Sequence, residues 1–208
     1  MISPAHLTQI DQLRQAVISY QAQKVDRSSY PAHIHAAVAL LLRQSPRGVE
    51  ILFILRAEFP GDPWSGNIAF PGGHIEANDE SAREAAERET FEEVGIDLSQ
   101  EEFLGELDDV AGAHLPVIVS CFAYHVSEFT TITQNCEITK TLWVPIDILT
   151  DPDRQRTHRV TFRGKELTRP AVDLLGLENP VLWGITYRLV SHFLQLTGKA
   201  LLPPTSIP

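Results

Sequence analysis

The segment 72–96 constrains this chain more than any other part of its sequence. Two adjacent glycines open the segment, a single glycine stands near its end, and residues 81–94 between them have a helical pattern. Ser81 and Glu84 have the spacing of a capping box, which predicts a helix that begins near residue 81. Gly95 suits the left-handed conformation in which many helices end. The segment therefore predicts one helix held between two glycine turns.

Three glutamates lie on one side of this predicted helix. An α-helix turns by about 100° per residue, so Glu89 and Glu93 fall on one stripe and Glu92 falls at its edge. Such like charges destabilise an isolated helix by roughly a few tenths of a kcal/mol per pair, unless a cation lies between them. Hard cations such as Mg²⁺ prefer oxygen ligands, which favours a metal site. The alternative is an ordinary solvated acidic face, but this stripe continues a stripe of small residues, Ala82 and Ala86, that suits close packing.

Segment 72–96 resembles the Nudix box, whose pattern is G-x5-E-x7-R-E-U-x-E-E-x-G-U, with U an apolar residue. The fixed positions are filled by Gly73, Glu80, Arg88, Glu89, Glu92, Glu93, Gly95 and Ile96. The segment differs from the pattern in two places, because one extra residue lies between Gly73 and Glu80 and because Thr90 occupies an apolar position. So many matches in one short window make the resemblance specific, and on them the chain is identified as a member of the Nudix hydrolase family.

The resemblance implies a role for each matching residue. The implied ligands of a catalytic Mg²⁺ or Mn²⁺ ion are Glu89, Glu93, Glu92 (directly or through water) and the carbonyl of Gly73. Arg88 would orient the glutamates, and Glu80 would brace Arg88 or the loop before it. The alternative for Arg88 is a surface ion pair with Glu84 or Glu92, which is a common and weak interaction.

The reaction implied by this resemblance is hydrolysis of a pyrophosphate bond. Metal ions held by the glutamates would offset the charge that develops on the phosphate oxygens and lower the pKa of a bound water. A carboxylate that the metal does not fully engage could serve as the general base. The candidates are Glu89 and Glu92 in the box and Glu137 in a downstream loop, and the sequence leaves the choice open.

Residues ahead of the box resemble the upstream signature of coenzyme A pyrophosphatases. The matching parts are Leu55-Arg56, the run from Gly66 to Gly73, the extra residue in the box and the later segment 181–186. The likeness implies that the substrate is coenzyme A or a derivative, cleaved to 3′,5′-ADP and phosphopantetheine. The implied contacts to substrate are Arg56, Phe70 and Gly72. Where the signature has Thr, Ser and His, this chain has Ile54, Ala57 and Trp64.

Two other interpretations remain open at this point. The substrate could be a different Nudix substrate, such as ADP-ribose or a dinucleoside polyphosphate. A third possibility, of another class, is a Nudix module that binds a regulatory ligand without catalysis, although the intact set of Arg88 and three glutamates argues against it. Trp64 and Phe70 could stack on an adenine base, but packing in the core is the more common role of such side chains.

By resemblance the fold is α/β, a Nudix fold in which an α/β/α sandwich is built around a mixed β-sheet. Hydrophobic periodicity agrees with this class. The expected strands are 36–43, 49–56, 103–107, 116–126 and 141–146, and the expected helices are 5–23, 81–94 and 180–196. Asn179 is the expected cap of the last helix and Pro180 its first residue. We expect one domain overall, with residues 1–30 as an N-terminal helix and lead-in and residues 31–208 as the hydrolase domain.

Charge and cysteine content restrict the partners and the compartment. A net charge of −10 is unfavourable for binding nucleic acid or an anionic membrane surface, so we expect a small-molecule nucleotide as partner, no nucleic acid and no membrane. The longest apolar run, 36–42, is too short to span a bilayer. Cys121 and Cys136 lack metal-ligand spacing and are expected to be reduced thiols in a cytoplasmic protein. The segment 181–196 could pack on the core or form a homodimer contact, and the sequence leaves both open.

Overall fold

The computed structural model describes residues 8–62, 64–113, 115–162, 164–176 and 178–201. The helices are α1 (Gln9–Ile18), α2 (Ala82–Val94), α3 (Ile146–Thr150) and α4 (Gly184–Leu196), with short 3-10 turns at Arg27–Ser29, Leu98–Gln100 and Pro152–Arg154. The strands are β1 (Ile34–Ser45), β2 (Gly48–Arg56), β3 (Ile68–Ala69), β4 (Gly72–His74), β5 (Glu102–Glu106), β6 (Val110–Ala111), β7 (Val117–His125), β8 (Ile138–Pro145), β9 (Gln155–Phe162), β10 (Lys165–Val172) and β11 (Leu182–Trp183).

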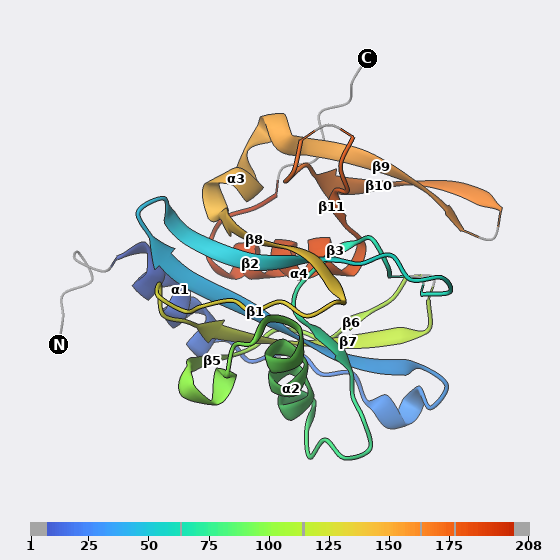
Figure 1. Cartoon of the computed structure of the whole chain (residues 1–208), viewed down its shortest axis with the longest axis horizontal. Coiled ribbons are helices and arrows are strands. Elements are labelled where there is room, and N and C mark those ends of the chain that lie inside the picture. The colour runs from blue at the N-terminus through green and yellow to red at the C-terminus, as the bar shows by residue number, and fades with distance from the viewer. Residues whose placement is uncertain (1–7, 63, 114, 163, 177, 202–208) are drawn as a thin grey trace.

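The main sheet is mixed, as the resemblance implies. Its strands follow the order β3-β2-β1-β7-β5, and β4, β6 and β8 pair with β1, β7 and β2 respectively (Figure 1). The long central pair β1 and β7 is parallel, with Ile34 opposite Val117 at one end and Leu42 opposite His125 at the other. The remaining pairs of this sheet are antiparallel.

The two faces of the sheet bury two separate sets of apolar side chains. Successive residues of a strand point to opposite faces, so Leu40 and Leu42 of β1 join one cluster while Leu41 joins the other. The first cluster includes the buried side chains of α1 and α4, and the second includes Ala85 and Ala86 of α2. Helices therefore cover both faces, and the α/β/α arrangement is confirmed.

The N-terminal helix is shorter than the predicted range of 5–23. Thr8 caps α1, which ends at Ile18, and residues 5–7 lie outside the described part of the chain. After the helix, the Tyr20 hydroxyl and the backbone N–H of Gln23 both donate to Asp108, at 2.7 Å each. These bonds to a distant residue hold residues 20–23 in an irregular conformation in place of the predicted helix. The proposed division between residues 1–30 and 31–208 stays a prediction.

A second, smaller sheet near the C-terminus has the order β11-β10-β9, and our list of strands missed it (Figure 1). It also corrects the start of the last helix, which is Gly184 rather than Pro180. Leu182 and Trp183 are extended because they pair with Val172 and Ala171 of β10. The indole N–H of Trp183 also donates to Asn67 at 2.8 Å, which ties this segment to the loop before β3. Tertiary pairing thus overrides the local Asn-Pro signal for a helix start.

Helix α4 packs on the core, which was one of the two alternatives for this segment. Its buried side chains are Leu189, Val190, Phe193 and Leu194. A homodimer stays a prediction.

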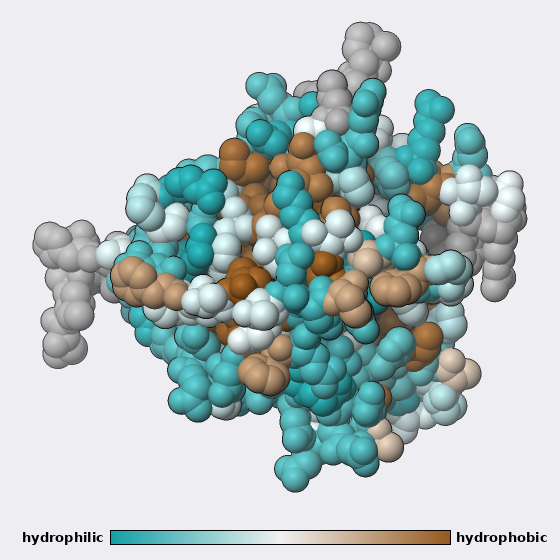
Figure 2. All heavy atoms as spheres, in the orientation of Figure 1, coloured by the Kyte–Doolittle hydropathy of each residue, from teal (hydrophilic) through white to brown (hydrophobic). Residues whose placement is uncertain are grey.

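On the face shown in Figure 2, hydrophilic residues surround smaller hydrophobic areas. No helix among the described residues combines the length and the hydropathy of a membrane-spanning segment. Both cysteines are free, and burial raises the pKa of the Cys121 thiol to about 12.

Candidate active site

Helix α2 forms where the sequence predicts it and carries the three glutamates. Ser81 accepts a hydrogen bond from the backbone N–H of Glu84 at 3.1 Å, and Gly95 ends the helix with a φ of 73°. Thr90, which occupies an apolar position of the box, is fully buried, and its hydroxyl donates to the carbonyl of Ala86 at 2.6 Å. A threonine is tolerated there because its hydroxyl has a partner inside the helix.

The two glycines of β4 allow the helix to approach the backbone closely. Gly72 has a φ of +142°, and a Cβ atom at this position would lie 2.3 Å from the carbonyl oxygen of Ala37. A Cβ atom on Gly73 would lie 2.4 Å from the carboxyl carbon of Glu89. Glycine is therefore required twice, once for backbone conformation and once for space beside a carboxylate.

Glu93 is the deepest of the glutamates, with 1% of its side chain exposed. One carboxylate oxygen accepts the backbone N–H of Gly72 at 2.9 Å, and the other lies 3.4 Å from Nη1 of Arg56. Burial raises the pKa of Glu93 to about 7, although Gly72 and Arg56 act in the opposite direction. A buried carboxylate whose charge is so poorly compensated is a strong candidate for a cation ligand.

Glu89 and Glu92 lie progressively nearer to solvent. The Glu89 side chain is 17% exposed, and its carboxylate accepts Nη1 of Arg88 at 2.9 Å. Burial raises the pKa of Glu89, and the neighbouring charges of Glu92 and Glu137 act in the same direction. The Glu92 side chain is 54% exposed and lies 3.5 Å from Arg88. The three predicted glutamates thus share one side of α2, and their exposure to solvent increases from Glu93 to Glu89 to Glu92.

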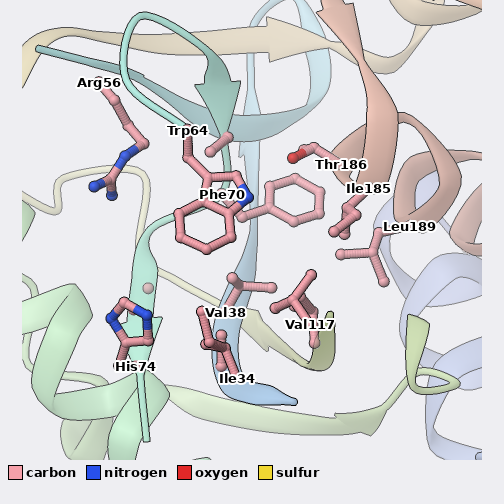
Figure 3. Close-up of a pocket in the computed structure, with 15 residues that line it drawn as sticks. Ile34, Val38, Arg56, Trp64, Phe70, His74, Val117, Ile185, Thr186 and Leu189 are labelled. Atoms are coloured by element: carbon pink, nitrogen blue, oxygen red, sulfur yellow. The ribbon is translucent and has the colours of Figure 1, made fainter. Parts of the chain in front are cut away.

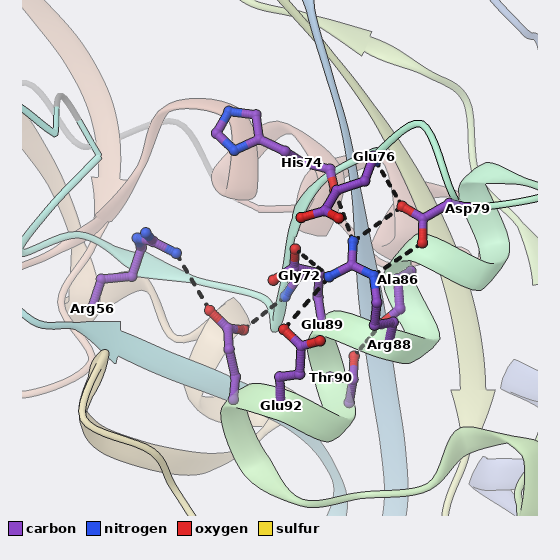
Figure 4. A network of polar contacts seen from close by, with 11 residues as sticks. Arg56, Gly72, His74, Glu76, Asp79, Ala86, Arg88, Glu89, Thr90 and Glu92 are labelled. Carbon is purple, nitrogen blue, oxygen red and sulfur yellow. Dashed lines mark hydrogen bonds and ion pairs between the residues drawn. The ribbon is translucent and has the colours of Figure 1, made fainter.

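Arg88 is held by Asp79, where we expected Glu80. Nε and Nη2 of Arg88 donate to the two carboxylate oxygens of Asp79, each at 3.0 Å, and Nη2 also donates to the carbonyl of His74 at 3.1 Å (Figure 4). These contacts lower the pKa of Asp79, while Glu80 is exposed and its backbone N–H donates to Glu84. The bracing role assigned to Glu80 is corrected to Asp79.

A signal for Asp79 exists in the sequence. Counted forward from Gly73, Asp79 follows five residues, which is the spacing of the box glutamate, whereas Glu80 has the right spacing only when counted back from Arg88. Since Asp79 is the residue that contacts Arg88, the one residue that this segment has in excess of the box pattern lies after Asp79. The ion pair of Arg88 with Glu92, our alternative role for this arginine, is also present but long, at 3.5 Å.

The loop that carries Glu137 is fastened to the end of α2. The backbone N–H of Asn135 donates to the carbonyl of Glu93 at 3.0 Å, and the side chain of Asn135 accepts the N–H of Glu137 at 2.9 Å. The Glu137 carbonyl accepts the N–H of Ala57, next to the end of β2, at 2.7 Å. The charge of Glu137 raises the pKa of both Glu89 and Glu93, so this exposed residue lies near the same site.

The three residues expected to contact substrate lie together beside the glutamates. Arg56 stands at the end of β2, paired with Glu93 and, at 3.2 Å, with Asp62. Phe70 is 1% exposed and stacks on Phe53 with ring centroids 5.2 Å apart, so packing is its main role. Arg56, Phe70 and Gly72 all line one pocket that opens beside the glutamates (Figure 3).

The donor set suits a divalent cation. Carboxylate oxygens are the preferred ligands of Mg²⁺. Burial raises the pKa values of Glu89 and Glu93, and nearby negative charges add to the effect, those of Glu92 and Glu137 on Glu89 and those of Glu89 and Glu137 on Glu93. The Glu89 carboxylate fills the space that a side chain at Gly73 would take. Among the described residues, no three or more His, Cys, Asp or Glu side chains are close enough together to form a preformed set of metal ligands. In this arrangement Glu89 is bonded to Arg88, and Glu93 is bonded to Gly72 and Arg56.

Comparisons with known proteins address the family and the fold of this chain. Residues 33–163 match the family described as the NUDIX domain. The chain is 34% identical over 113 residues to uncharacterized protein C14C4.10c of Schizosaccharomyces pombe, covering 50% of this chain and 34% of that protein. It is 27% identical over 134 residues to the uncharacterized Nudix hydrolase NudL of Yersinia pestis, covering 63% of this chain and 64% of that protein.

One solved structure shows the shared fold. The MutT/nudix family protein from Enterococcus faecalis is 17% identical, with a TM-score of 0.53, over 98% of this chain and 78% of that chain. The matched region spans about a third of the S. pombe protein, and it spans 52% of Nudix hydrolase 22 and 61% of Nudix hydrolase 15 of Arabidopsis thaliana.

Proposed function

Because this chain belongs to the NUDIX family, we propose that it hydrolyses the pyrophosphate bond of a nucleoside-diphosphate-linked small molecule with a divalent metal ion. The observation that carries the proposal is the packing of two glutamates against a glycine pair. Glu93 accepts the N–H of Gly72, and Glu89 lies where a side chain at Gly73 would be. A buried acidic pair of this kind is costly to maintain unless a cation compensates it.

Each residue of the site has a proposed role. Glu89 and Glu93 would hold Mg²⁺ or Mn²⁺, with Glu92 and the Gly73 carbonyl as further ligands, and Arg88 keeps Glu89 oriented. When bound, the metal supplies charge compensation for the phosphates and acidifies a coordinated water. Arg56, at the edge of the pocket, is suited to bind a phosphate through its guanidinium.

The general base is proposed to be Glu137. Glu89 is hydrogen-bonded to Arg88, and Glu92 lies at the exposed rim. The backbone N–H and carbonyl of Glu137 are both hydrogen-bonded, and its charge acts on Glu89 and Glu93 from a separate loop. A positioned carboxylate outside the ligand set can accept a proton from the attacking water.

Coenzyme A or a derivative is the proposed substrate, cleaved to 3′,5′-ADP and phosphopantetheine. Support comes from the upstream residues Leu55-Arg56 and the run from Gly66 to Gly73, of which Arg56, Ala69, Phe70, Gly72 and Gly73 line the pocket. ADP-ribose and dinucleoside polyphosphates are the alternative substrates, and a regulatory module without turnover is the alternative of another class. A cytoplasmic location is part of the proposal, since both cysteines are free.

A substrate screen tests this proposal. Coenzyme A, ADP-ribose and a dinucleoside polyphosphate are incubated with Mg²⁺ or Mn²⁺, with and without EDTA, and products are identified by mass spectrometry. We expect EDTA-sensitive turnover, with 3′,5′-ADP and phosphopantetheine from coenzyme A. Glu93→Gln should lower kcat by about a thousandfold or more while the protein stays folded, because a buried ligand carboxylate is lost. Normal turnover by this variant would refute the metal assignment, and no turnover of any substrate would favour a regulatory module.

A further inference from the structure

The pocket beside the glutamates has two chemically different ends (Figure 3). One end contains Arg56, His74 and the backbone of Gly72 and Gly73. The other end is mostly aliphatic, and its lining residues are Ile34, Val38, Val117, Val119, Ile185, Leu189 and Thr186. The rings of Trp64 and Phe70 lie between the two ends (Figure 3). Since the proposed function places the diphosphate at the polar end, the aliphatic end would receive the group attached to one of the phosphates.

The aliphatic end is assembled from three elements that are far apart in the sequence. Strand alternation turns Ile34 and Val38 of β1 toward this face, and the parallel register sets Val117 of β7 opposite Ile34. Ile185 and Leu189 lie one turn apart on α4, so they form the opposite wall. The main sheet and α4 thus shape one continuous apolar surface.

A sugar or a nucleobase would be poorly matched to this end of the pocket. A polar group that leaves water costs free energy unless it gains a hydrogen bond in the site. Among the described residues at the aliphatic end, Thr186 is the one that brings a hydroxyl. Ribose and adenine each carry several donors or acceptors, whereas a branched alkyl group carries none and gains from contact with these walls.

We infer that this protein selects a diphosphate that carries an aliphatic alcohol on one phosphate, with the aliphatic arm at the aliphatic end of the pocket. The inference rests on the proposed function, because the diphosphate must lie at the glutamate site. It narrows the substrate class, since both outer groups of ADP-ribose and of dinucleoside polyphosphates are sugars. Coenzyme A fits the class, because a branched aliphatic carbon adjoins its diphosphate.

A matched pair of substrates tests the inference. The neopentyl ester of ADP and ADP-ribose share the nucleoside and the diphosphate and differ only in the arm on the β-phosphate. Water attacks phosphorus and the P–O–P bond breaks, so the products are AMP and either neopentyl phosphate or ribose 5-phosphate. We expect kcat/KM for the neopentyl ester to exceed that for ADP-ribose by at least about tenfold, the scale of discrimination by an apolar pocket.

Variants at the pocket locate the preference. Ile34→Asn and Ile185→Asn should each reduce the ratio of the two kcat/KM values by about tenfold. Ile18→Asn is the matched control, because Ile18 is 57% exposed and does not line the pocket. Calorimetry with the non-hydrolysable methylene analogue of each substrate gives a second readout, in which the two pocket variants should lose affinity for the neopentyl analogue. Thermal melting verifies that each variant is folded.

The outcomes separate the inference from the proposed function. Equal or faster hydrolysis of ADP-ribose, or an unchanged ratio in both pocket variants, would overturn the inference and leave the proposed function intact. If neither of these substrates is hydrolysed with Mg²⁺ or Mn²⁺, and coenzyme A and a dinucleoside polyphosphate are not hydrolysed either, the proposed function fails. In that case the affinities of the two methylene analogues, measured by calorimetry, test the inference. Tighter binding of the neopentyl analogue would support it, and equal or weaker binding would overturn it.

Discussion

Arg88 shows how strongly one side chain depends on its neighbours at this site. Its guanidinium joins Glu89 of the helix to Asp79 and the carbonyl of His74 in the preceding loop. Asp79 is 4% exposed and contacts Arg88 with both oxygens, so this carboxylate fixes the plane of the guanidinium. The orientation of Glu89 is therefore set by a residue that does not itself touch the proposed metal.

Asp79→Asn and Glu80→Gln form a matched pair of adjacent substitutions. Asp79→Asn should lower kcat by about 10- to 100-fold, the usual effect of losing a residue that orients a metal ligand. It should also cost about 1–3 kcal/mol of stability, because a nearly buried charged hydrogen-bond partner is lost. Glu80→Gln, at an exposed position, should leave both close to wild type. Steady-state kinetics and denaturant unfolding measure kcat and stability. If Glu80→Gln lost more of both than Asp79→Asn, Glu80 would be the residue that braces Arg88.

The buried carboxylate of Glu93 should make the metal-free protein sensitive to pH. Burial raises the pKa of Glu93 from 4.5 to about 7, against the opposing effects of Gly72 and Arg56 and with the support of Glu89 and Glu137. A raised pKa in the folded state means that the stabilising contribution is complete below pH 4.5 and is lost as pH rises to about 7. The full change corresponds to roughly 3 kcal/mol.

Melting curves in EDTA check this prediction between pH 4.5 and 7.5. We expect the Tm of the wild type to fall across this window by more than the Tm of Glu93→Gln, whose side chain does not titrate. An identical pH dependence of the two proteins would show that other groups control the stability in this range.

At the scale of elements, the site is made where a helix end meets a loop and a strand end. The carbonyls of Glu93 and Val94, left without partners inside α2, accept the backbone N–H groups of Asn135 and Thr133. The same loop reaches Ala57, just after β2, through the Glu137 carbonyl. The loop is thus anchored at both ends, and Glu137 is held near the glutamates of α2.

This anchoring predicts separate effects for the two loop residues. Glu137→Gln should lower kcat by about 10²- to 10⁴-fold, the range for loss of a general base, and should remove the acidic limb of the pH–rate profile. Asn135→Ala removes the side chain that accepts the Glu137 N–H, and should give a smaller loss, about tenfold, with the pH profile preserved. An unchanged pH–rate profile in Glu137→Gln would exclude this residue as the base.

At the scale of the whole molecule, stability and metal binding should be coupled. The chain carries a net charge of −10, and the site concentrates carboxylates that repel one another in the folded state. A cation that binds only the folded protein stabilises it by about 2.7 kcal/mol at a hundred times its Kd. For a chain of this size that corresponds to a rise in Tm of roughly 5–10 °C.

Differential scanning fluorimetry tests this coupling by titration of Mg²⁺ or Mn²⁺. We expect a concentration-dependent rise in Tm for the wild type, reversed by EDTA, and almost none for Glu93→Gln. Glu128→Gln is a suitable charge control, since Glu128 is an exposed residue of the loop after β7. A rise of equal size in all three proteins would point to binding elsewhere on the acidic surface.

Several features could be predicted because the forces that create them act over short stretches of sequence. Helix α2 follows from a serine cap, a 3.6-residue period and a glycine at its end, and it lies where the pattern placed it. The mixed sheet follows from the family resemblance and from apolar runs that correspond to β1, β2, β5, β7 and β8. Features that depend on distant partners were missed or misplaced, among them the β9–β10–β11 sheet and the start of α4.

Local sequence is sufficient for the helix, its flanking glycines and the order of its acidic residues, because capping, helical period and backbone freedom are local properties. Three further features depend on contacts across the fold: Asp79 braces Arg88, the loop of Glu137 is bonded to α2, and β1, β7 and α4 line an aliphatic end of the pocket. These contacts depend on which groups meet across the fold and are buried together, and local spacing carries no information on such encounters.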